Sequence, residues 1–333
     1  MLLIDWLKLE VRRRIIKSLL APSHRKKIRG KRERKRKTEN RSHQVFYLHQ
    51  VDDPYSHLCC QILDQLENSY DIEVIPLVVG PPPPSSTPEV EMLQKHNIED
   101  AKMIAPYYGL AFETNEMNIE SKNIKIAQSI LLGTNQETFI KVSLKVGEAL
   151  WRNDSETLQD LQQNSTALSD EEISARIAIN SQKQKKLGHY YGGVFAYEGE
   201  CYGCIDRVPF LEERLVELGT NKSDQQSIFK RKSLKDELPL KLDGLTLEVL
   251  FSVRSPYSYL ALPQLIEFRK RYPIKVVYRP ILPMVMRGMV INREKMFYIL
   301  SDCKRIAEKK GIPFGNIADP LGKAVERLSL IHI

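Results

Sequence analysis

Two stretches of the chain show the same order of apolar and polar positions. Each begins with an apolar run, Val45–Val51 or Leu247–Val253, whose length and composition are typical of a buried strand. Apolar residues at helical spacing follow, and a second apolar run, Ile72–Val79 or Ile274–Tyr278, completes each stretch. This order predicts strand, helix and strand, the βαβ unit of a parallel sheet with a right-handed crossover. We therefore expect an α/β fold.

The helix of each predicted unit has a clear start signal. Asp53 and Ser255 occupy the expected N-cap positions, and Pro54 and Pro256 follow at the first helical position, where a missing N–H costs nothing. In the first stretch the apolar spacing then continues over Leu58–Leu66, which predicts one uninterrupted helix.

The two stretches are related by a constant offset of 202 residues, since 44–78 aligns with 246–280 without a gap. Ten positions are identical, whereas average composition would give roughly two matches by chance. A repeat with so long a period indicates duplicated domains. The identical pairs are Leu48/Leu250, Val51/Val253, Pro54/Pro256, Tyr55/Tyr257, Ser56/Ser258, Leu58/Leu260, Leu63/Leu265, Tyr70/Tyr272, Ile72/Ile274 and Val74/Val276.

The second stretch carries a specific motif. Residues 251–260 read FSVRSPYSYL after the first strand, which resembles the opening of kappa-class glutathione transferases and 2-hydroxychromene-2-carboxylate isomerases. Both belong to the DsbA-like branch of the thioredoxin fold, whose disulfide oxidoreductases carry C-P-x-C at this turn. Ser255–Ser258 has serine at both cysteine positions, and Asp53–Ser56 has aspartate and serine. The resemblance covers nearly all of 44–327.

Two further segments fit the same resemblance. The family inserts a helical domain into its thioredoxin core, and residues 88–186 are mostly helix-like. Residues 192–207 read GGVFAYEGECYGCIDR, two strands around a turn before a helix at 208–218, which resembles the closing segment of the family. The cis-proline of the family falls on Gly193 here, while Asp206 and Arg207 keep its D-R pair.

These observations predict tandem thioredoxin-like (DsbA-like) domains, each with a helical insertion, the second copy incomplete. We expect the second copy to be truncated, because the first extends to about Leu218, and we expect the last six residues to be a translated sequencing adaptor. The predicted segments are a basic extension over 1–43, a first domain over 44–218 with an insertion at about 86–187, a linker over 219–244, a partial second domain over 245–327 and an artefact over 328–333.

The positive charge lies almost entirely before the first domain. Residues 1–43 carry sixteen Lys/Arg and four Asp/Glu, a net charge of +12, so the remainder of a chain of net charge +8 is slightly acidic. An amphipathic helix over 1–20 followed by a basic run over 24–37 is typical of peripheral contact with anionic membranes. Nucleic-acid contact and a solvated, disordered extension remain alternatives. No apolar run is long enough to cross a membrane.

Ser255 is the predicted catalytic residue. In the enzymes that this segment resembles, the equivalent serine donates a hydrogen bond to the sulfur of bound glutathione, and Pro256, Tyr257 and Ser258 would complete that binding turn. The free N–H groups and partial positive charge of a helix N-terminus favour a thiolate there. The alternative is that Ser-Pro is a common pair of N-cap and first helical residues.

Residues after the second strand of copy two resemble the family's region that contacts glutathione and substrate through an asparagine and basic side chains. Asn292 is our match for the asparagine, although the spacing needs a gap. Arg287 and Lys295 would bind carboxylates of glutathione or of an aromatic acid. The alternative is that both are solvated side chains on helix surfaces.

Copy one is predicted to hold a degenerate site, formed by Asp53, Gly193, Asp206 and Arg207. A carboxylate at position 53 would raise the pKa of a neighbouring thiol by charge repulsion, while capping the helix as well as serine does. The helix of copy one would then be capped normally, but its turn would not stabilise a thiolate.

The cysteines favour no metal site. Cys201 and Cys204 form a C-x-x-C pair, but the pair lies in a predicted hairpin and not at the helix start that would lower a thiol pKa. Zinc would need a second pair, and the adjacent Cys59 and Cys60 face different sides of a helix. Buried thiols of a reducing compartment are the better interpretation.

We therefore predict a cytoplasmic glutathione-dependent transferase or cis–trans isomerase of the 2-hydroxychromene-2-carboxylate type, with peripheral membrane contact through residues 1–37 as an open alternative. Its expected partners are a small aromatic or electrophilic substrate, glutathione as cofactor and, as a further open alternative, a second copy of the chain; no specific nucleic acid is expected. The rival hypotheses are a thiol–disulfide oxidoreductase and a non-catalytic binding scaffold.

Overall fold

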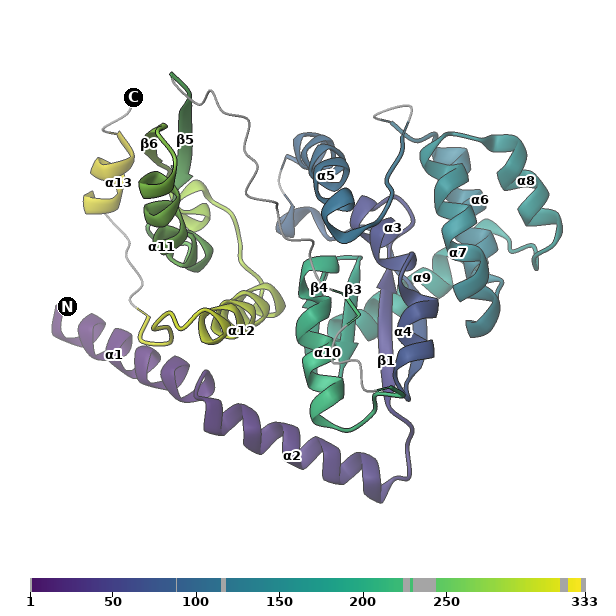
Figure 1. The fold of residues 1–333 in the computed structure, drawn as a ribbon, viewed down its shortest axis with the longest axis horizontal. Coiled ribbons are helices and arrows are strands. Elements are labelled where there is room, and N and C mark those ends of the chain that lie inside the picture. Colours follow the sequence, from purple (N-terminus) through teal and green to yellow (C-terminus); the bar gives the residue numbers. More distant parts are fainter. Residues whose placement is uncertain are drawn as a thin grey trace. The chain divides into compact units, whose positions relative to one another are not determined.

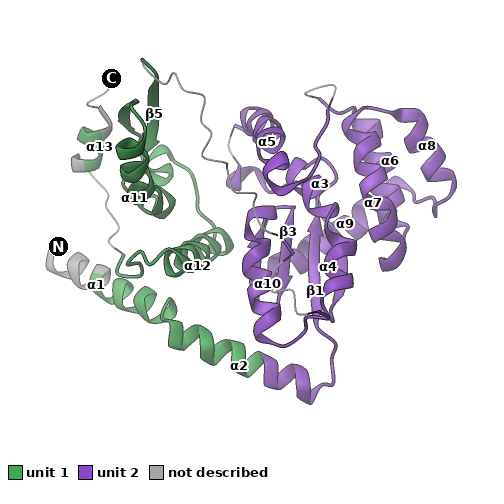
Figure 2. Ribbon diagram, viewed as in Figure 1, with its two compact units in different colours: residues 1–32, 234–333 green, residues 33–233 purple. Residues whose placement is uncertain are grey.

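The computed structural model describes residues 2–87, 89–114, 118–223, 228–229, 244–317 and 323–330. The chain divides into two compact units, which Figure 2 colours separately. Unit 2 spans residues 33–233, and unit 1 consists of residues 1–32 and 234–333. The domain boundaries expected from the sequence differ from the boundaries of these two units. They stay predictions.

The sheet of unit 2 has the strand order β2-β1-β3-β4. Its strands are β1 (Gln44–His49), β2 (Glu73–Val78), β3 (Val194–Tyr197) and β4 (Glu200–Gly203). β1 pairs in parallel with β2 and antiparallel with β3, which forms a hairpin with β4. A parallel βαβ unit followed by an antiparallel hairpin and a helix is the arrangement that the resemblance predicts.

Helices surround this sheet and form a separate segment between β2 and β3 (Figure 1). They are α3 (Pro54–Cys60), α4 (Leu63–Ser69), η1 (Pro84–Ser86), α5 (Val90–Ile104), η2 (Ala105–Tyr108), α6 (Ser121–Leu132), α7 (Gln136–Trp151), α8 (Ser155–Gln163), α9 (Asp170–Leu187), η3 (Ile205–Arg207) and α10 (Val208–Glu217). The main core joins β1, α3, α4, α6, α7 and α10 through buried apolar side chains.

The helix predicted over 58–66 is interrupted in unit 2. α3 ends at Cys60, and α4 begins at Leu63 after a turn in which Ile62 N–H donates to the Cys59 carbonyl. The Gln61 amide donates to the Ala111 carbonyl at 2.7 Å and to the His57 carbonyl at 3.3 Å, and it accepts from Ala111 N–H at 3.1 Å. The side chain at the break thus contacts a residue fifty positions away, which local spacing could not reveal.

Close packing fixes α3 against the helical segment. Gly147 of α7 lies directly beside His57, and a Cβ at position 147 would approach His57 Nδ1 to 2.3 Å. Only glycine fits this approach, so α7 and the start of α3 are held at a fixed distance.

The described part of unit 1 contains a two-stranded parallel sheet. Its elements are β5 (Thr246–Phe251), α11 (Pro256–Arg271), β6 (Lys275–Pro280), η4 (Met284–Arg287), α12 (Arg293–Lys309) and α13 (Lys323–Leu330). The register pairs Thr246 with Lys275, which is the β1–β2 register of Gln44 with Glu73 moved by 202 residues. A small core of Leu260, Cys303 and Ala307 joins α11 to α12.

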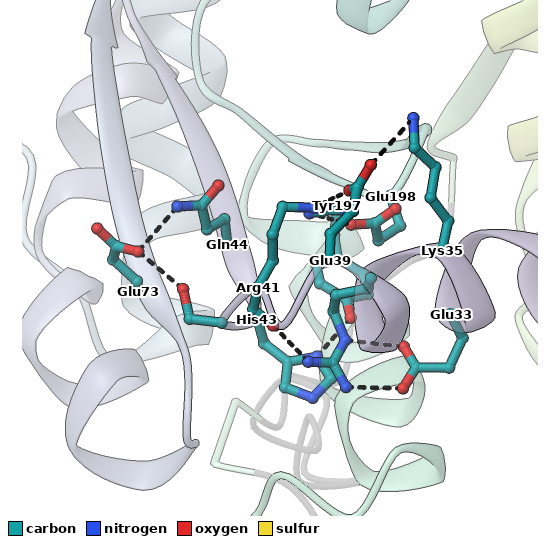
Figure 3. A network of polar contacts seen from close by, with 11 residues as sticks. Glu33, Lys35, Glu39, Arg41, His43, Gln44, Glu73, Tyr197 and Glu198 are labelled. Atoms are coloured by element: carbon teal, nitrogen blue, oxygen red, sulfur yellow. Dashed lines mark hydrogen bonds and ion pairs between the residues drawn. The ribbon is translucent and has the colours of Figure 1, made fainter.

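The basic N-terminal extension forms α1 (Leu2–Leu19) and α2 (Pro22–Thr38), and α2 continues across the boundary between the units. From Glu33 onward the chain is fixed to the sheet of unit 2 by polar contacts (Figure 3). Arg36 pairs with Glu33 at 2.7 Å and donates to the Arg41 carbonyl at 2.6 Å. Arg41 pairs with Glu198 at 3.0 Å. The ordered framework of unit 2 therefore begins before the first strand.

Candidate active-site turns

The turn before α11 holds the serine that the sequence singled out. Ser255 is the N-cap in an extended conformation, with Pro256 at the first helical position. Ser255 Oγ accepts a hydrogen bond from Ser258 N–H at 3.3 Å, and Ser258 Oγ accepts one from Ser252 N–H at 3.3 Å. Both serines of the S-P-Y-S motif thus order the turn by accepting from the backbone.

The Ser255 hydroxyl retains a proton that it can donate. A serine hydroxyl has one donor and two acceptor positions, and the contact with Ser258 N–H uses only an acceptor. Among the described residues, no hydrogen bond donated by the Ser255 hydroxyl is found. Together with the positive end of the sixteen-residue α11, the turn can bind an anion such as a thiolate.

Tyr257, the residue between these serines, connects the turn to α12. Its hydroxyl donates to Asp302 Oδ2 at 2.9 Å, and Asp302 is fully buried. Burial, followed by the nearby Asp302 charge, raises the pKa of Tyr257 far above its usual value, so the phenol stays a donor. The hydrogen bond orients the turn relative to α12.

The remaining predicted residues lie at the other end of α12 or before it. Asn292 caps this helix by accepting from Lys295 N–H at 2.7 Å, about three turns before Asp302. Burial lowers the pKa of the half-buried Lys295. Arg287 is exposed at the end of η4. The structure therefore gathers residues 255–258 into one turn, while Asn292, Lys295 and Arg287 lie on other elements of unit 1.

The equivalent turn of unit 2 has the same form with different chemistry. Asp53 caps α3, and its Oδ2 accepts from Ser56 N–H at 2.8 Å and from Ser56 Oγ–H at 2.7 Å. Burial raises the pKa of Asp53 from 3.8 to about 6, in spite of these two hydrogen bonds, which lower it. Near neutral pH this position carries a negative charge where unit 1 offers a hydroxyl proton.

One pair of contacts in these turns is not predicted by the sequence patterns above. Tyr55 donates to Asp100 Oδ2 at 2.7 Å, which is the Tyr257–Asp302 contact at the offset of 202 residues. The aspartates lie beyond the aligned stretch, which ended at residue 280. Comparing 100–112 with 302–314 would have found them, because Asp, Lys, Ile, Ala, Gly and Phe recur there at matching positions.

The other predicted residues of the degenerate site separate into two groups. Gly193 lies against the turn, with a positive φ of 62°, and a Cβ there would come within 3.1 Å of Ser56 N. Asp206 and Arg207 form an ion pair with each other in η3. Gly193 is thus part of the turn, whereas the D-R pair precedes α10.

Comparison with known proteins now gives the family of one segment. Residues 246–332 match the family model described as DSBA-like thioredoxin domain. This segment is similar to DSBA-like thioredoxin domains. The similarity agrees with the predicted fold, and the matched residues contain the whole S-P-Y-S turn. The DSBA-like segment also includes Asp302, the partner of Tyr257.

One similar solved structure is that of a 2-hydroxychromene-2-carboxylate isomerase (HCCA isomerase). It is 14% identical, with a TM-score of 0.39, and the match covers 53% of this chain and 96% of that one. A similarity of this size carries no functional argument. No curated protein matches the chain. Over the described residues, none of the helices has both the length and the apolar character needed to span a bilayer.

Proposed function

We propose that the DSBA-like segment binds glutathione at the N-terminus of α11 and serves a glutathione-dependent isomerase or transferase of small unsaturated aromatic acids or other electrophiles. The proposal rests on the hydrogen bonding of the Ser255 hydroxyl. Its oxygen accepts a bond that caps α11, and its proton can still be donated to an anion. Bound glutathione would supply the thiolate nucleophile.

Ser255 acts in this proposal as a hydrogen-bond donor and not as a nucleophile. A donor at the positive end of a helix stabilises a thiolate relative to the thiol, and so lowers the thiol pKa. Tyr257 holds the turn in place through Asp302. The absence of cysteine from S-P-Y-S argues against the rival disulfide oxidoreductase at this turn, because the turn cannot form a disulfide.

Carboxylates of glutathione or of the aromatic substrate require cationic partners. The half-buried Lys295 and the exposed Arg287 are the proposed ones. Asn292 would act with them through its side-chain amide. These three assignments rest on the family resemblance.

The turn of unit 2 is proposed as a non-catalytic relative of this site. Asp53 accepts both available protons of Ser56, and its charge would repel a thiolate. This observation favours a binding or structural role for unit 2, within a protein whose reaction takes place in unit 1.

Calorimetric titration with two ligands tests the proposal. Glutathione and S-methylglutathione share every group except the ionisable thiol. Ser255→Ala should weaken glutathione binding by about tenfold to a hundredfold at pH 8, since one hydrogen bond to a charged group is lost. Binding of S-methylglutathione should not change.

Two results would contradict the proposed glutathione site. Equal weakening of both ligands would make Ser255 a structural cap, and no glutathione binding by the wild-type protein would remove the site altogether. Asp53→Ala is the matched control, because it removes the corresponding cap of unit 2 and should leave both affinities unchanged.

A further inference from the structure

Two cysteines from distant parts of the sequence meet beside the turn of unit 2. Cys59 lies on α3 and is fully buried, whereas Cys204 follows β4 and is partly exposed. Cys59 Sγ donates to the Gly193 carbonyl at 3.6 Å, and Cys204 N–H donates to the same oxygen at 2.7 Å. The two cysteines therefore meet at one carbonyl oxygen, and the neighbouring Cys204 side chain contributes to a raised pKa of Cys59.

The neighbouring cysteines are directed elsewhere. Cys201 Sγ donates to the Leu187 carbonyl at 3.4 Å, and Cys60 Sγ donates to the His57 carbonyl at 3.1 Å. Cys204 shares the Gly193 carbonyl with Cys59, which lies on a different element.

The backbone holds Cys204 in an unusual conformation. Its φ of 60° and ψ of 173° fall in a region that residues with a Cβ rarely adopt, at a cost that the surrounding structure must offset. Gly193, whose carbonyl anchors Cys204, packs tightly on Tyr55 and Ser56. Two packed elements thus fix the Cys204 backbone beside the carbonyl that Cys59 contacts.

We propose that Cys59 and Cys204 form a redox-active dithiol whose oxidant is a low-molecular-weight disulfide such as oxidised glutathione. The partly exposed Cys204 thiolate attacks one sulfur of the small disulfide, forms a mixed disulfide and releases one thiol. Cys59 then loses its proton and attacks Cys204 Sγ, forming the Cys59–Cys204 bond and releasing the second thiol. Two protein thiols are oxidised, one small disulfide is reduced, and the two released thiols take up the two protons.

The environment of Cys59 determines how fast the second step proceeds. Burial, followed by the neighbouring Cys204 and the charge of Asp53, raises the pKa of Cys59 well above its usual value. The thiolate needed for closure is therefore scarce at neutral pH, and closure should accelerate as pH rises. Once formed, the disulfide carries no buried charge.

The test uses the full-length protein in glutathione buffers of stepped redox ratio. After acid quenching and alkylation, intact mass and peptide mapping should find one oxidised species, in which the peptides containing Cys59 and Cys204 are linked. Cys59→Ala should accumulate a stable glutathione adduct on Cys204, whereas Cys204→Ala should leave Cys59 unmodified because it is buried. Cys201→Ser is the matched control and should form the same link.

A link between Cys201 and Cys204, a persistent Cys204 adduct in the wild-type protein, or full alkylation at every redox ratio would overturn the proposal. If a variant fails to fold, the peptide map of the wild-type protein is sufficient to test the proposal. Ser255→Ala should form the Cys59–Cys204 link at the same redox ratio as the wild type, so this result is independent of glutathione binding in unit 1.

Discussion

At the scale of single residues, the two helix starts differ by the group that caps them. Asp53 and Ser255 both accept a hydrogen bond from the backbone N–H three residues later. Capping leaves Ser255 a proton to donate, while Asp53 accepts a second bond from Ser56 Oγ. Equivalent caps can therefore support anion binding in one copy and oppose it in the other.

Asp53→Asn should stabilise unit 2 at alkaline pH. Burial raises the pKa of Asp53 from 3.8 to about 6, so its contribution to folding is most favourable below pH 3.8 and is lost as pH rises through 6. Asparagine keeps an acceptor for Ser56 N–H without the charge. We expect about 1–3 kcal/mol of added unfolding free energy at pH 8 and little difference near pH 4.

Urea unfolding at both pH values measures this difference. A variant that is less stable at pH 8 would mean that the ionised carboxylate is fully compensated by its hydrogen bonds with Ser56.

Local sequence signals were sufficient to predict the helix caps. They were insufficient to predict the aspartates that the tyrosines of these turns contact. Asp53, Ser255 and the prolines after them are read from the residue types alone. Asp100 and Asp302 resemble ordinary polar residues of amphipathic helices, and their roles depend on tyrosines 45 positions earlier. The dissimilar connections 79–97 and 281–299 ended the alignment before it reached them.

At the scale of elements, the strands, the hairpin and the helical segment follow from apolar periodicity and turn residues. The division between α3 and α4 does not, and Gln61 at the break pairs with Ala111, fifty residues away in the sequence. Likewise, sequence patterns predicted no partner for Cys204, whereas the fold brings Cys204 and Cys59 to the same Gly193 carbonyl.

The two tyrosine–aspartate contacts should differ in their importance for stability. Tyr257→Phe leaves the fully buried Asp302 without its phenol partner, which should cost about 1–3 kcal/mol. Tyr55→Phe should cost less, because Asp100 is only half-buried and water can replace the phenol.

Thermal unfolding of the two variants, monitored in parallel, checks this order. Equal losses would show that solvent access to the carboxylate does not decide the cost, and a larger loss for Tyr55→Phe would contradict the expected order.

At the scale of the whole molecule, the N-terminal extension divides at Glu33. Before it, Val11 and Ile15 are exposed, with about half of each side chain accessible, among many basic residues. After it, Arg36 donates to the Arg41 carbonyl, and Arg41 pairs with Glu198 in the β3–β4 hairpin of the unit 2 sheet. The sequence identified the charge and the apolar stripe, but an Arg/Lys run gave no indication of where contacts with the unit 2 sheet begin.

On the hypothesis of membrane contact, deleting residues 1–32 should abolish binding to anionic vesicles and leave the unfolding transition of unit 2 unchanged, because the contacts from Glu33 onward remain. The double variant Val11→Ser/Ile15→Ser keeps every charge and should weaken vesicle binding without abolishing it, since each basic residue near the surface contributes about 1 kcal/mol. Vesicle co-sedimentation at low and high salt measures the vesicle binding of both variants. Unchanged vesicle binding after the deletion would exclude the extension as the membrane contact.

The most direct test of the proposed site is the thiol pKa of bound glutathione, measured from the ultraviolet absorbance of the thiolate during a pH titration. In the wild-type protein this pKa should lie below that of free glutathione, because the Ser255 hydroxyl and the start of α11 stabilise the anion. Ser255→Ala should raise it, and Ser255→Asp, which reproduces Asp53, should raise it further through charge repulsion. The same thiol pKa in all three proteins would contradict the proposed role and leave Ser255 as a helix cap alone.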